Sequence, residues 1–273
     1  MFKVGLSSCG KILDERLFAE YAHSGIDAIE ISPSWFEYKD LDYQMLYRWS
    51  RQYDIQLWSY HLPFPTTNLC SSDQGIRLCS VEYLCELIKQ AGNICVEKFV
   101  VHAGLEPVSL EPDKRAEAIK CSKDSLDALA NHAEKYNAVV CVEDLPRSCL
   151  GNCSEEILDL ISVNDKLRIC LDTNHLLKEE NSDFISMVGS KIVTTHISDY
   201  DYVDERHWLP GEGKICWQSL LNNLKDIHYQ GVWMYEIGFR CPETRIRSRD
   251  LKCSDFVRNA KELFNNQEIT IVR

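Results

Sequence analysis

Eight short runs of mostly apolar residues are spread along the chain at intervals that leave room for one helix between neighbours. Each run is rich in Val, Ile and Leu, and its apolar residues follow one another rather than alternating with polar ones. This pattern is typical of strands buried on both faces, as in a parallel sheet covered by helices. We therefore predict strands at residues 3–8, 27–32, 55–62, 98–103, 138–144, 167–172, 191–197 and 232–237.

Segments with helical spacing separate the runs. The first helix is predicted to begin after Asp14, a residue type that often caps helices, and to end at Gly25. Further helices are predicted within residues 80–92, 111–137, 217–231 and 248–266. Eight strand-then-helix units without a Pro-, Ser- or Gly-rich spacer favour a closed (β/α)8 barrel over an open sheet. We expect an α/β protein with a single TIM-barrel domain over residues 1–273.

An imidazole or a carboxylate stands at the end of six of these runs. These residues are His61, His102, Glu143, Asp172, His196 and Glu236. In a parallel barrel all strand ends meet on one face, so the six side chains should converge although no local motif joins them. A lone strand-end histidine is more often a hydrogen-bonded core or rim residue than a ligand. Six such positions, including buried carboxylates that need a cation or several donors, predict a metal site.

The ligand types narrow the choice of metal. The candidate set mixes carboxylates with imidazoles and contains no thiolate. Such a set suits Mn²⁺, Zn²⁺, Co²⁺ or Fe²⁺ and disfavours a structural zinc. The sequence does not choose among these ions.

Charge and cysteine content restrict the class of protein. The formal net charge is −12, whereas nucleic-acid-binding proteins usually carry a basic face, so nucleic acid is not expected as the main partner. The thirteen cysteines are scattered, which favours reduced thiols over a secreted disulfide framework. No apolar stretch approaches membrane-spanning length, and the first residues lack the apolar region of a signal peptide. We therefore expect a cytoplasmic protein without a membrane partner.

The strand-end motifs resemble those of the xylose isomerase-like TIM-barrel superfamily, which includes sugar phosphate isomerases and epimerases and AP endonuclease family 2, the endonuclease IV type. The motifs are CVEDLP, LDTNH, THISD and YEIGF, and PGEGKICW at residues 210–217 is similar to the family's Pro-Gly-x-Gly loop. For the isomerase and epimerase branch, the resemblance implies one divalent metal per chain, held by Glu143, Asp172, His196 and Glu236. It also implies that His175 reaches the substrate or a second metal.

The endonuclease branch offers a second interpretation of the same chain. Its pattern implies three zinc ions and adds a histidine on each of strands three and four and an Asp-x-His in the loop after strand seven. His61, His102 and His207 match these positions, while Glu205 stands where that branch has aspartate. The Arg- and Lys-bearing loops that grip DNA are not evident, in agreement with the acidic net charge.

The leading hypothesis is a metal-dependent isomerase or epimerase that converts a sugar or sugar phosphate through a cis-enediolate. Glu143 and Glu236, on strands that lie across the barrel mouth, are the candidates for removing and returning the proton. The metal would stabilise the developing oxyanion. The remaining candidates would contact the substrate: His175 and His207 for hydroxyls or a phosphate, Arg206 and Arg240 for a phosphate, and Trp35, Phe36, Phe64 and Trp208 as an apolar wall.

Alternatives to these assignments stay open. A solvated rim position suits Arg206 and Arg240 equally well, and ordinary packing suits the aromatic residues better. Glu30, near the end of the second run, could reach the mouth or be capped by loop amides. A lyase or dehydratase acting on a keto-sugar or an inositol-like compound would use the same enediolate chemistry, and a non-catalytic sugar-binding barrel is a further class. Barrels of this branch often form homo-oligomers, but the sequence names no interface.

Overall fold

The computed structural model describes residues 2–34, 37–105 and 108–272. Its eight strands lie within the eight predicted runs and are β1 (Val4–Ser7), β2 (Ala28–Ile31), β3 (Gln56–His61), β4 (Lys98–Val101), β5 (Val139–Glu143), β6 (Arg168–Asp172), β7 (Ile192–His196) and β8 (Trp233–Tyr235). The helices between and after them are α1 (Glu15–Ser24), α2 (Tyr43–Tyr53), α3 (Gln74–Gly92), α4 (Pro112–Ala133), α5 (Ser154–Ile161), α6 (Asn181–Val188), α7 (Trp217–Asp226) and α8 (Cys253–Phe264). Two short 3₁₀ helices, η1 (Glu134–Tyr136) and η2 (Gly189–Lys191), precede β5 and β7.

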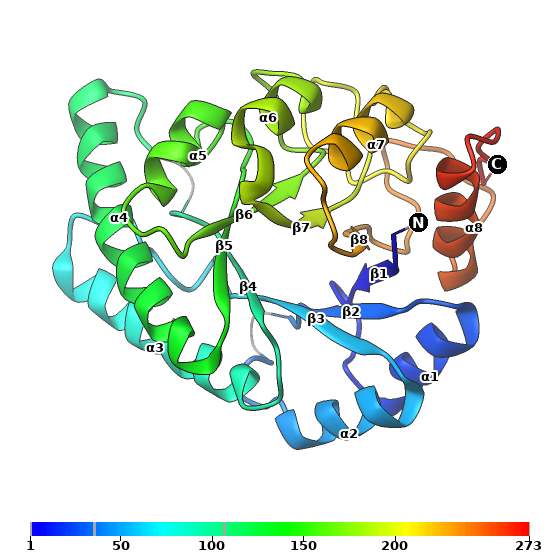
Figure 1. Cartoon of the computed structure of the whole chain (residues 1–273), viewed down its shortest axis with the longest axis horizontal. Helices are drawn as coiled ribbons and strands as arrows, with labels where there is room; N and C mark the ends of the chain where they lie inside the picture. Colours follow the sequence, from blue (N-terminus) through cyan, green and yellow to red (C-terminus); the bar gives the residue numbers. More distant parts are fainter. Residues whose placement is uncertain (1, 35–36, 106–107, 273) are drawn as a thin grey trace.

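All eight strands are parallel neighbours in one sheet, in the order β7-β6-β5-β4-β3-β2-β1-β8. The two edges of this sheet meet where Ile197, just after β7, bridges to Tyr235 of β8. There the Ile197 amide donates to the carbonyl of Met234 at 2.7 Å. The helices surround the strands (Figure 1). The predicted α/β class and the predicted (β/α)8 barrel are confirmed.

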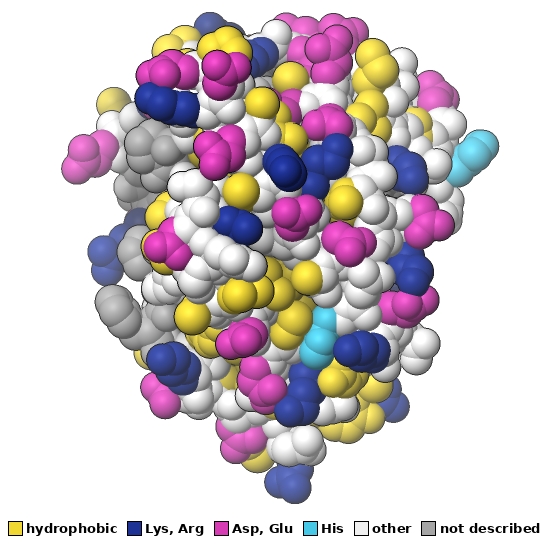
Figure 2. All heavy atoms as spheres, turned by 90° about the vertical axis from the view of Figure 1, so that its left-hand side faces the viewer, with side chains coloured by type: hydrophobic (Ala, Val, Ile, Leu, Met, Phe, Trp, Pro, Cys, Tyr) yellow, Lys and Arg dark blue, Asp and Glu magenta, His cyan; other side chains and the backbone are white. Residues whose placement is uncertain are grey.

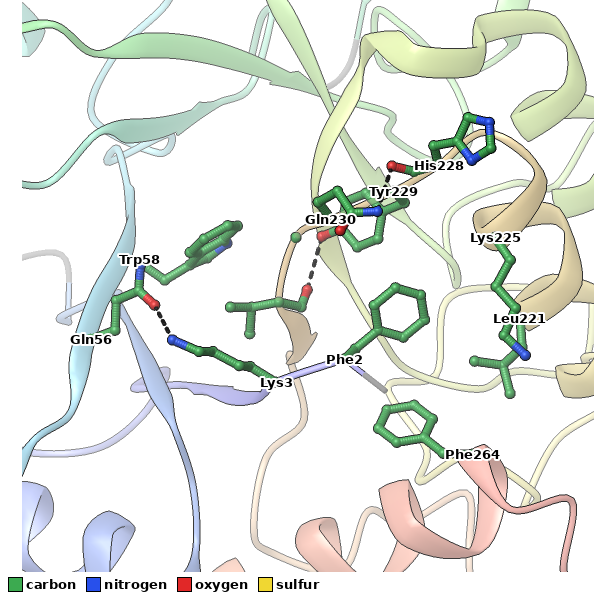
Figure 3. Close-up of a pocket in the computed structure, with 12 residues that line it drawn as sticks. Phe2, Lys3, Gln56, Trp58, Leu221, Lys225, His228, Tyr229, Gln230 and Phe264 are labelled. Carbon is green, nitrogen blue, oxygen red and sulfur yellow. Dashed lines mark hydrogen bonds between the residues drawn. The ribbon is translucent and has the colours of Figure 1, made fainter.

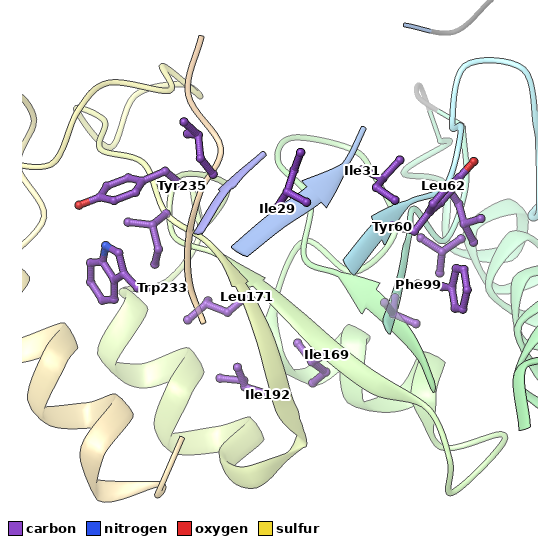
Figure 4. Close-up of a cluster of buried hydrophobic side chains, with 14 of the residues drawn as sticks. Ile29, Ile31, Tyr60, Leu62, Phe99, Ile169, Leu171, Ile192, Trp233 and Tyr235 are labelled. Atoms are coloured by element: carbon purple, nitrogen blue, oxygen red, sulfur yellow. The ribbon is translucent and has the colours of Figure 1, made fainter. Parts of the chain in front are cut away.

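Side chains of each strand alternate between the helices and the inside of the barrel. The outward set packs into the main apolar core beneath the helices (Figure 4), and it includes Ile29, Ile31, Tyr60, Phe99, Ile169 and Leu171. The residues between them form small separate clusters, which are Ala28, Val232 and Met234, and Val100, Cys141 and Cys170. Because side chains two positions apart share a face, the residues that follow these clusters along their strands also point into the barrel. Glu30, His102, Glu143 and Asp172 are those residues.

Helix ends agree with the prediction where the local signals are strong. The side chain of Asp14 accepts a first-turn amide of α1 at 3.1 Å, and Gly25 ends this helix with a φ of 84°. The seventh helix is shorter than the segment 217–231 in which it was predicted, because α7 ends at Asp226. His228 takes a left-handed φ of 57°, and Tyr229 then turns back into the core.

The surface and the thiols add two observations. Figure 2 shows the side of the barrel on which α3 and α4 lie, and acidic and basic side chains are interspersed over this face rather than gathered in a basic stripe. The described residues include all thirteen cysteines and contain no disulfide bond, in agreement with the predicted reduced thiols. Within the described ranges, no helix is long and apolar enough to cross a membrane.

Candidate metal centre

The six strand-end residues lie together at the carboxyl end of the barrel. The last residues of β3, β5, β6 and β7 are His61, Glu143, Asp172 and His196, and the residues that directly follow β4 and β8 are His102 and Glu236. The four strand-terminal side chains are almost completely buried, whereas the other two keep about 15% of their surface accessible. Barrel closure therefore brings together groups that are far apart in the sequence.

Four of these residues form a group with the spacing of ligands around one ion. The ligand atoms of Glu143, Asp172, His196 and Glu236 all lie within 4.8 Å of one another. From His196 Nδ1, the nearest oxygens are 2.8 Å away on Glu143, 3.3 Å on Glu236 and 4.0 Å on Asp172. Donors held about 2.1 Å from a common ion are themselves separated by roughly 3 Å or slightly more.

Asp172 supplies an independent sign that this group fits a cation. Its Oδ1 accepts the amide of Asn174 at 2.7 Å. Its Oδ2 is buried and has no hydrogen-bond partner among the described residues. Buried polar atoms normally have partners, and a buried carboxylate oxygen without one is strongly disfavoured unless a cation compensates it. The donor set and this oxygen together fit a divalent metal ion.

Glu143 connects this group to two further histidines. Its Oε2 lies 3.2 Å from His61 Nε2 and 3.0 Å from His102 Nε2, while its Oε1 faces His196. The ligand atoms of His61, Glu143 and His196 form a second compact group within 4.8 Å. Glu143 is thus placed where a carboxylate could bridge two neighbouring ions.

A third group lies nearer the solvent and consists of His175, Glu205 and His207. The Nε2 of His175 is 3.6 Å from an oxygen of Glu205, and the rings of His175 and His207 are perpendicular with centroids 5.8 Å apart. Asn174 holds the loop in place, because its Oδ1 accepts the amides of Arg206 at 2.6 Å and His207 at 3.2 Å. Glu205 stands where the endonuclease branch has aspartate, but its carboxylate still faces the two histidines.

Glu30 belongs to the site in a way that neither sequence alternative described. It neither reaches the mouth nor is capped by loop amides. Its Oε2 accepts from the Oγ of Ser59 at 2.8 Å and lies 2.9 Å from His196 Nε2. The signal available in the sequence was its inward position in β2, but its partner lies 166 residues away in β7. Only the closed barrel brings the two together.

These contacts shift the pKa values of the two proposed acid–base carboxylates in opposite directions. Burial works to raise the pKa of Glu143, but the charge of His196 and the hydrogen bonds from the surrounding histidines hold it well below its ordinary value. Burial raises the pKa of Glu236, although His196 opposes this. Two carboxyl groups whose pKa values are separated by their environments are suited to different roles in proton transfer.

The pKa values of the histidines also shift in opposite directions. Burial works to lower the pKa of His61, but the hydrogen bond and charge of Glu143 raise it to about 9. For His175, burial is likewise outweighed by Asp172 and Glu143, and the pKa is about 9. Burial lowers the pKa of His102 despite its contact with Glu143. The neighbouring carboxylates therefore favour a proton on His61 and His175.

Two adjoining cavities open onto the site. One, of about 360 Å³, is lined by His102, Glu143, His175, Glu205 and Arg147, among others. The other, of about 530 Å³, extends toward the ends of β1 and β2. Four residues line both cavities, and they are His61, Phe64, His207 and Glu236. Phe64 stacks on the ring of His102, with centroids 4.1 Å apart, and so forms an apolar wall beside the candidate ligands.

Other predicted substrate contacts lie away from the lining of these cavities. Trp208 is buried, donates from Nε1 to Thr244 at 2.9 Å and packs against the guanidinium of Arg245. Arg206 pairs with Asp201 at 3.0 Å, and Arg240 is exposed on the rim. Trp35 and Phe36 fall outside the described residues.

One cationic residue of the lining was not foreseen. Arg147 has a left-handed φ of 53° and pairs with Asp204 at 2.9 Å and with Glu205 at 3.4 Å. It follows β5 by four residues in a polar loop, so no strand pattern marked it.

Comparisons with known proteins agree with this geometry. The family model described as xylose isomerase-like TIM barrel matches residues 18–255. An uncharacterized protein of Methanocaldococcus jannaschii is 29% identical over 222 residues, which are 77% of this chain and 74% of that protein. A D-psicose 3-epimerase of Ruminiclostridium cellulolyticum is 28% identical, with 79% of this chain and 75% of the relative aligned.

Two further similarities bear on function. A probable endonuclease 4 of Acholeplasma laidlawii is 29% identical, with 59% of this chain and 60% of that protein aligned. Among solved structures, a D-tagatose 3-epimerase-like protein superposes with a TM-score of 0.82 at 25% identity, and 97% of each chain is covered. Both branches expected from the motifs are therefore represented among the relatives.

Proposed function

The chain belongs to the xylose isomerase-like TIM-barrel family, and from this premise we propose that it is a divalent-metal-dependent isomerase or epimerase of a sugar or sugar phosphate. The observation that carries the proposal is the convergence of Glu143, Asp172, His196 and Glu236, whose ligand atoms lie within 4.8 Å of one another. The epimerases among the relatives support the same class of reaction.

Those four residues would hold one Mn²⁺, Co²⁺, Fe²⁺ or Zn²⁺ per chain, because oxygen and imidazole donors without a thiolate suit these ions. When bound, the ion would act as a Lewis acid that stabilises the negative charge developing on a substrate oxygen. The ion would then compensate the buried Oδ2 of Asp172, which has no hydrogen-bond partner among the described residues.

Glu143 and Glu236 would move the proton. One carboxylate would take the proton from the carbon next to the carbonyl, and the electron pair of that C–H bond would form the enediolate. The opposite carboxyl group would return a proton to the other face or to the neighbouring carbon. Glu236 lines both cavities and has a raised pKa, which favours its alternation between the two protonation states. Glu143 has a lowered pKa and would stay ionised more readily.

The cavity walls would orient the sugar. His175 and His207 present imidazoles for substrate hydroxyls, and Phe64 presents an apolar face beside His102. The free thiols of this chain are in keeping with a reducing compartment, and we place the enzyme in the cytoplasm on that ground.

The test is a panel of keto-hexoses, keto-pentoses and their phosphates, incubated with protein loaded with Mn²⁺ or Co²⁺ and followed by chromatography and NMR. A new epimer or isomer formed by the wild type and not by Glu236→Gln would support the proposal. Loss of water from the sugar would indicate the dehydratase alternative. A folded, metal-loaded protein that converts no sugar would contradict the proposal.

A trinuclear-zinc phosphodiesterase acting on abasic DNA is the second candidate, and a specific observation favours it. Among the described residues, ligand atoms form three compact groups rather than one, and two of these groups share Glu143 and His196. The net charge of −12 counts against a DNA partner. About three zincs per chain by elemental analysis, with cleavage of an abasic oligonucleotide, would favour this candidate. About one metal per chain would favour the isomerase.

A further inference from the structure

His196 lies between Glu30 on one edge of its ring and three other carboxylates on the opposite edge. Its Nδ1 faces Glu143, Asp172 and Glu236, while its Nε2 is 2.9 Å from Glu30 Oε2. Both His196 and Glu30 are completely buried. The ring also stacks on that of His61, with centroids 5.7 Å apart and 15° between the planes. Its orientation is therefore fixed by contacts on both edges and on one face.

Core packing alone does not explain why a carboxylate stands at Glu30. Its Oε2 takes both hydrogen bonds, one from Ser59 and one from His196, and its Oε1 is buried without a hydrogen-bond partner among the described residues. No lysine or arginine of the described chain forms an ion pair with it. A buried carboxylate compensated in this incomplete way destabilises the folded state relative to an apolar residue of similar size.

A carboxylate at this position can fix the tautomer of His196. An imidazole nitrogen that binds a metal must present its lone pair, so the ring proton has to sit on the other nitrogen. Here Nδ1 faces the candidate ligand atoms, and Nε2–H would donate to Glu30. A carboxylate that accepts this proton fixes the ring and makes the metal-binding nitrogen more basic.

We propose that Glu30 is the positioning residue of the centre, holding His196 in the Nε2–H tautomer so that Nδ1 binds the divalent ion. The inference rests on the proposed function, because it assumes that His196 is a ligand. Glu30 itself lines neither cavity, so a substrate held in them would not touch it. Its replacement therefore acts through metal binding before it acts on turnover.

The test compares Co²⁺ binding by wild type, Glu30→Leu and Glu30→Gln, measured by titration calorimetry and by the visible absorption of the bound ion. Glu30→Leu removes the acceptor, and its Co²⁺ affinity should fall by about 10- to 100-fold, with a changed absorption spectrum. Glu30→Gln keeps an acceptor for Nε2–H but removes the negative charge, so it should recover most of the wild-type spectrum with an affinity reduced by about threefold or more.

A matched control is Glu156→Gln, because Glu156 is also a largely buried carboxylate but pairs with Arg115 outside the barrel mouth. Its Co²⁺ affinity should equal that of the wild type. A folded Glu30→Leu that binds Co²⁺ as tightly as the control overturns the inference. Should Glu30→Leu not fold, Glu30→Gln decides alone, and wild-type affinity in that variant overturns the inference. A wild type that binds no Co²⁺, Mn²⁺ or Zn²⁺ overturns the proposed function instead.

Discussion

The cavities at the two ends of this barrel differ more in the chemistry of their lining residues than in their volume. The amino end holds a cavity of about 710 Å³, larger than either cavity at the carboxyl end. Figure 3 shows its walls, where Phe2, Trp58 and Phe264 contribute rings and Lys3 pairs with Gln56 at 3.2 Å. Among its lining residues there is no carboxylate, and Lys225 and His228 are exposed at its edge.

Each cavity at the carboxyl end has a smaller volume, but buried titratable groups are concentrated at this end. Glu30, Glu143 and Asp172 are completely or almost completely buried there, and each of them faces the buried ring of His196. The two ends differ in chemistry even along one strand, because β3 begins with Gln56 at the amino-end cavity and ends with His61 at the candidate site. Cavity volume alone favours the amino end, whereas buried polar atoms without hydrogen-bond partners and converging candidate ligands favour the carboxyl end.

The largest effect is expected at the carboxyl end, from neutralising either carboxylate of the proposed acid–base pair. Glu143→Gln and Glu236→Gln should each reduce sugar turnover by at least about 100-fold, because each removes a group that transfers a proton. The measurement is kcat with saturating Mn²⁺, together with circular dichroism to show that the fold is kept. Activity close to that of the wild type in either variant would remove that residue from the proposed mechanism.

Asp172→Asn tests the candidate ligand whose Oδ2 has no hydrogen-bond partner in the described ranges. The amide lacks the negative charge that a divalent ion requires, so Mn²⁺ affinity should fall by about tenfold or more. Calorimetric titration measures the change, and Glu156→Gln again serves as the control. Unchanged affinity and stoichiometry would show that Asp172 is not a ligand.

As the pH rises, the stability of the metal-free protein and its affinity for metal should change in opposite directions. In chelator-treated protein, His61 and His175 have pKa values of about 9 against an ordinary value of 6.5. Their protonation therefore stabilises the folded chain fully below pH 6.5, and this contribution is lost as the pH rises through about 9. Metal affinity should increase over the same range, because loss of these protons removes positive charge beside the candidate ligands Glu143 and Asp172.

Thermal unfolding across this pH range checks both halves of that prediction. The Tm of the protein in chelator should fall as the pH rises, and the gain in Tm on adding Mn²⁺ should grow. A Tm in chelator that rises between pH 6.5 and 9 would contradict the assignment of protons to His61 and His175.

The smallest effect is expected at the amino end. Lys225→Ala changes an exposed residue at the edge of the larger cavity, so it should alter the free energy of unfolding by no more than about 0.5 kcal/mol. Sugar turnover and Mn²⁺ affinity should equal those of the wild type. A substantial change in kcat/KM would mean that the amino-end cavity takes part in the reaction and that the two ends are less distinct than described.

The sequence was sufficient to predict the barrel and the convergence of its strand-end groups, for a simple physical reason. Continuous apolar runs require strands covered on both faces, and a closed parallel sheet directs every strand end to one mouth. His61, Glu143, Asp172 and His196 could therefore be grouped before any contact was known.

The remaining features depend on the shape of the closed barrel or on loop conformation, which periodicity does not encode. The pairing of Glu30 with His196 crosses the barrel interior between strands that are not neighbours. The left-handed backbone at Arg147 and the burial of Trp208 are set by loop contacts. These are the features that the predicted substrate contacts did not anticipate.

The most direct test of the account is hydrogen exchange between solvent and substrate. Mn²⁺-loaded protein would be incubated in D₂O with the keto-sugar panel, and NMR would follow the C–H group next to the carbonyl. The account predicts that deuterium enters at this carbon together with formation of the epimer or isomer, and that Glu236→Gln abolishes both. Absence of exchange in every sugar, with cleavage of abasic DNA by a three-zinc form of the protein, would contradict it.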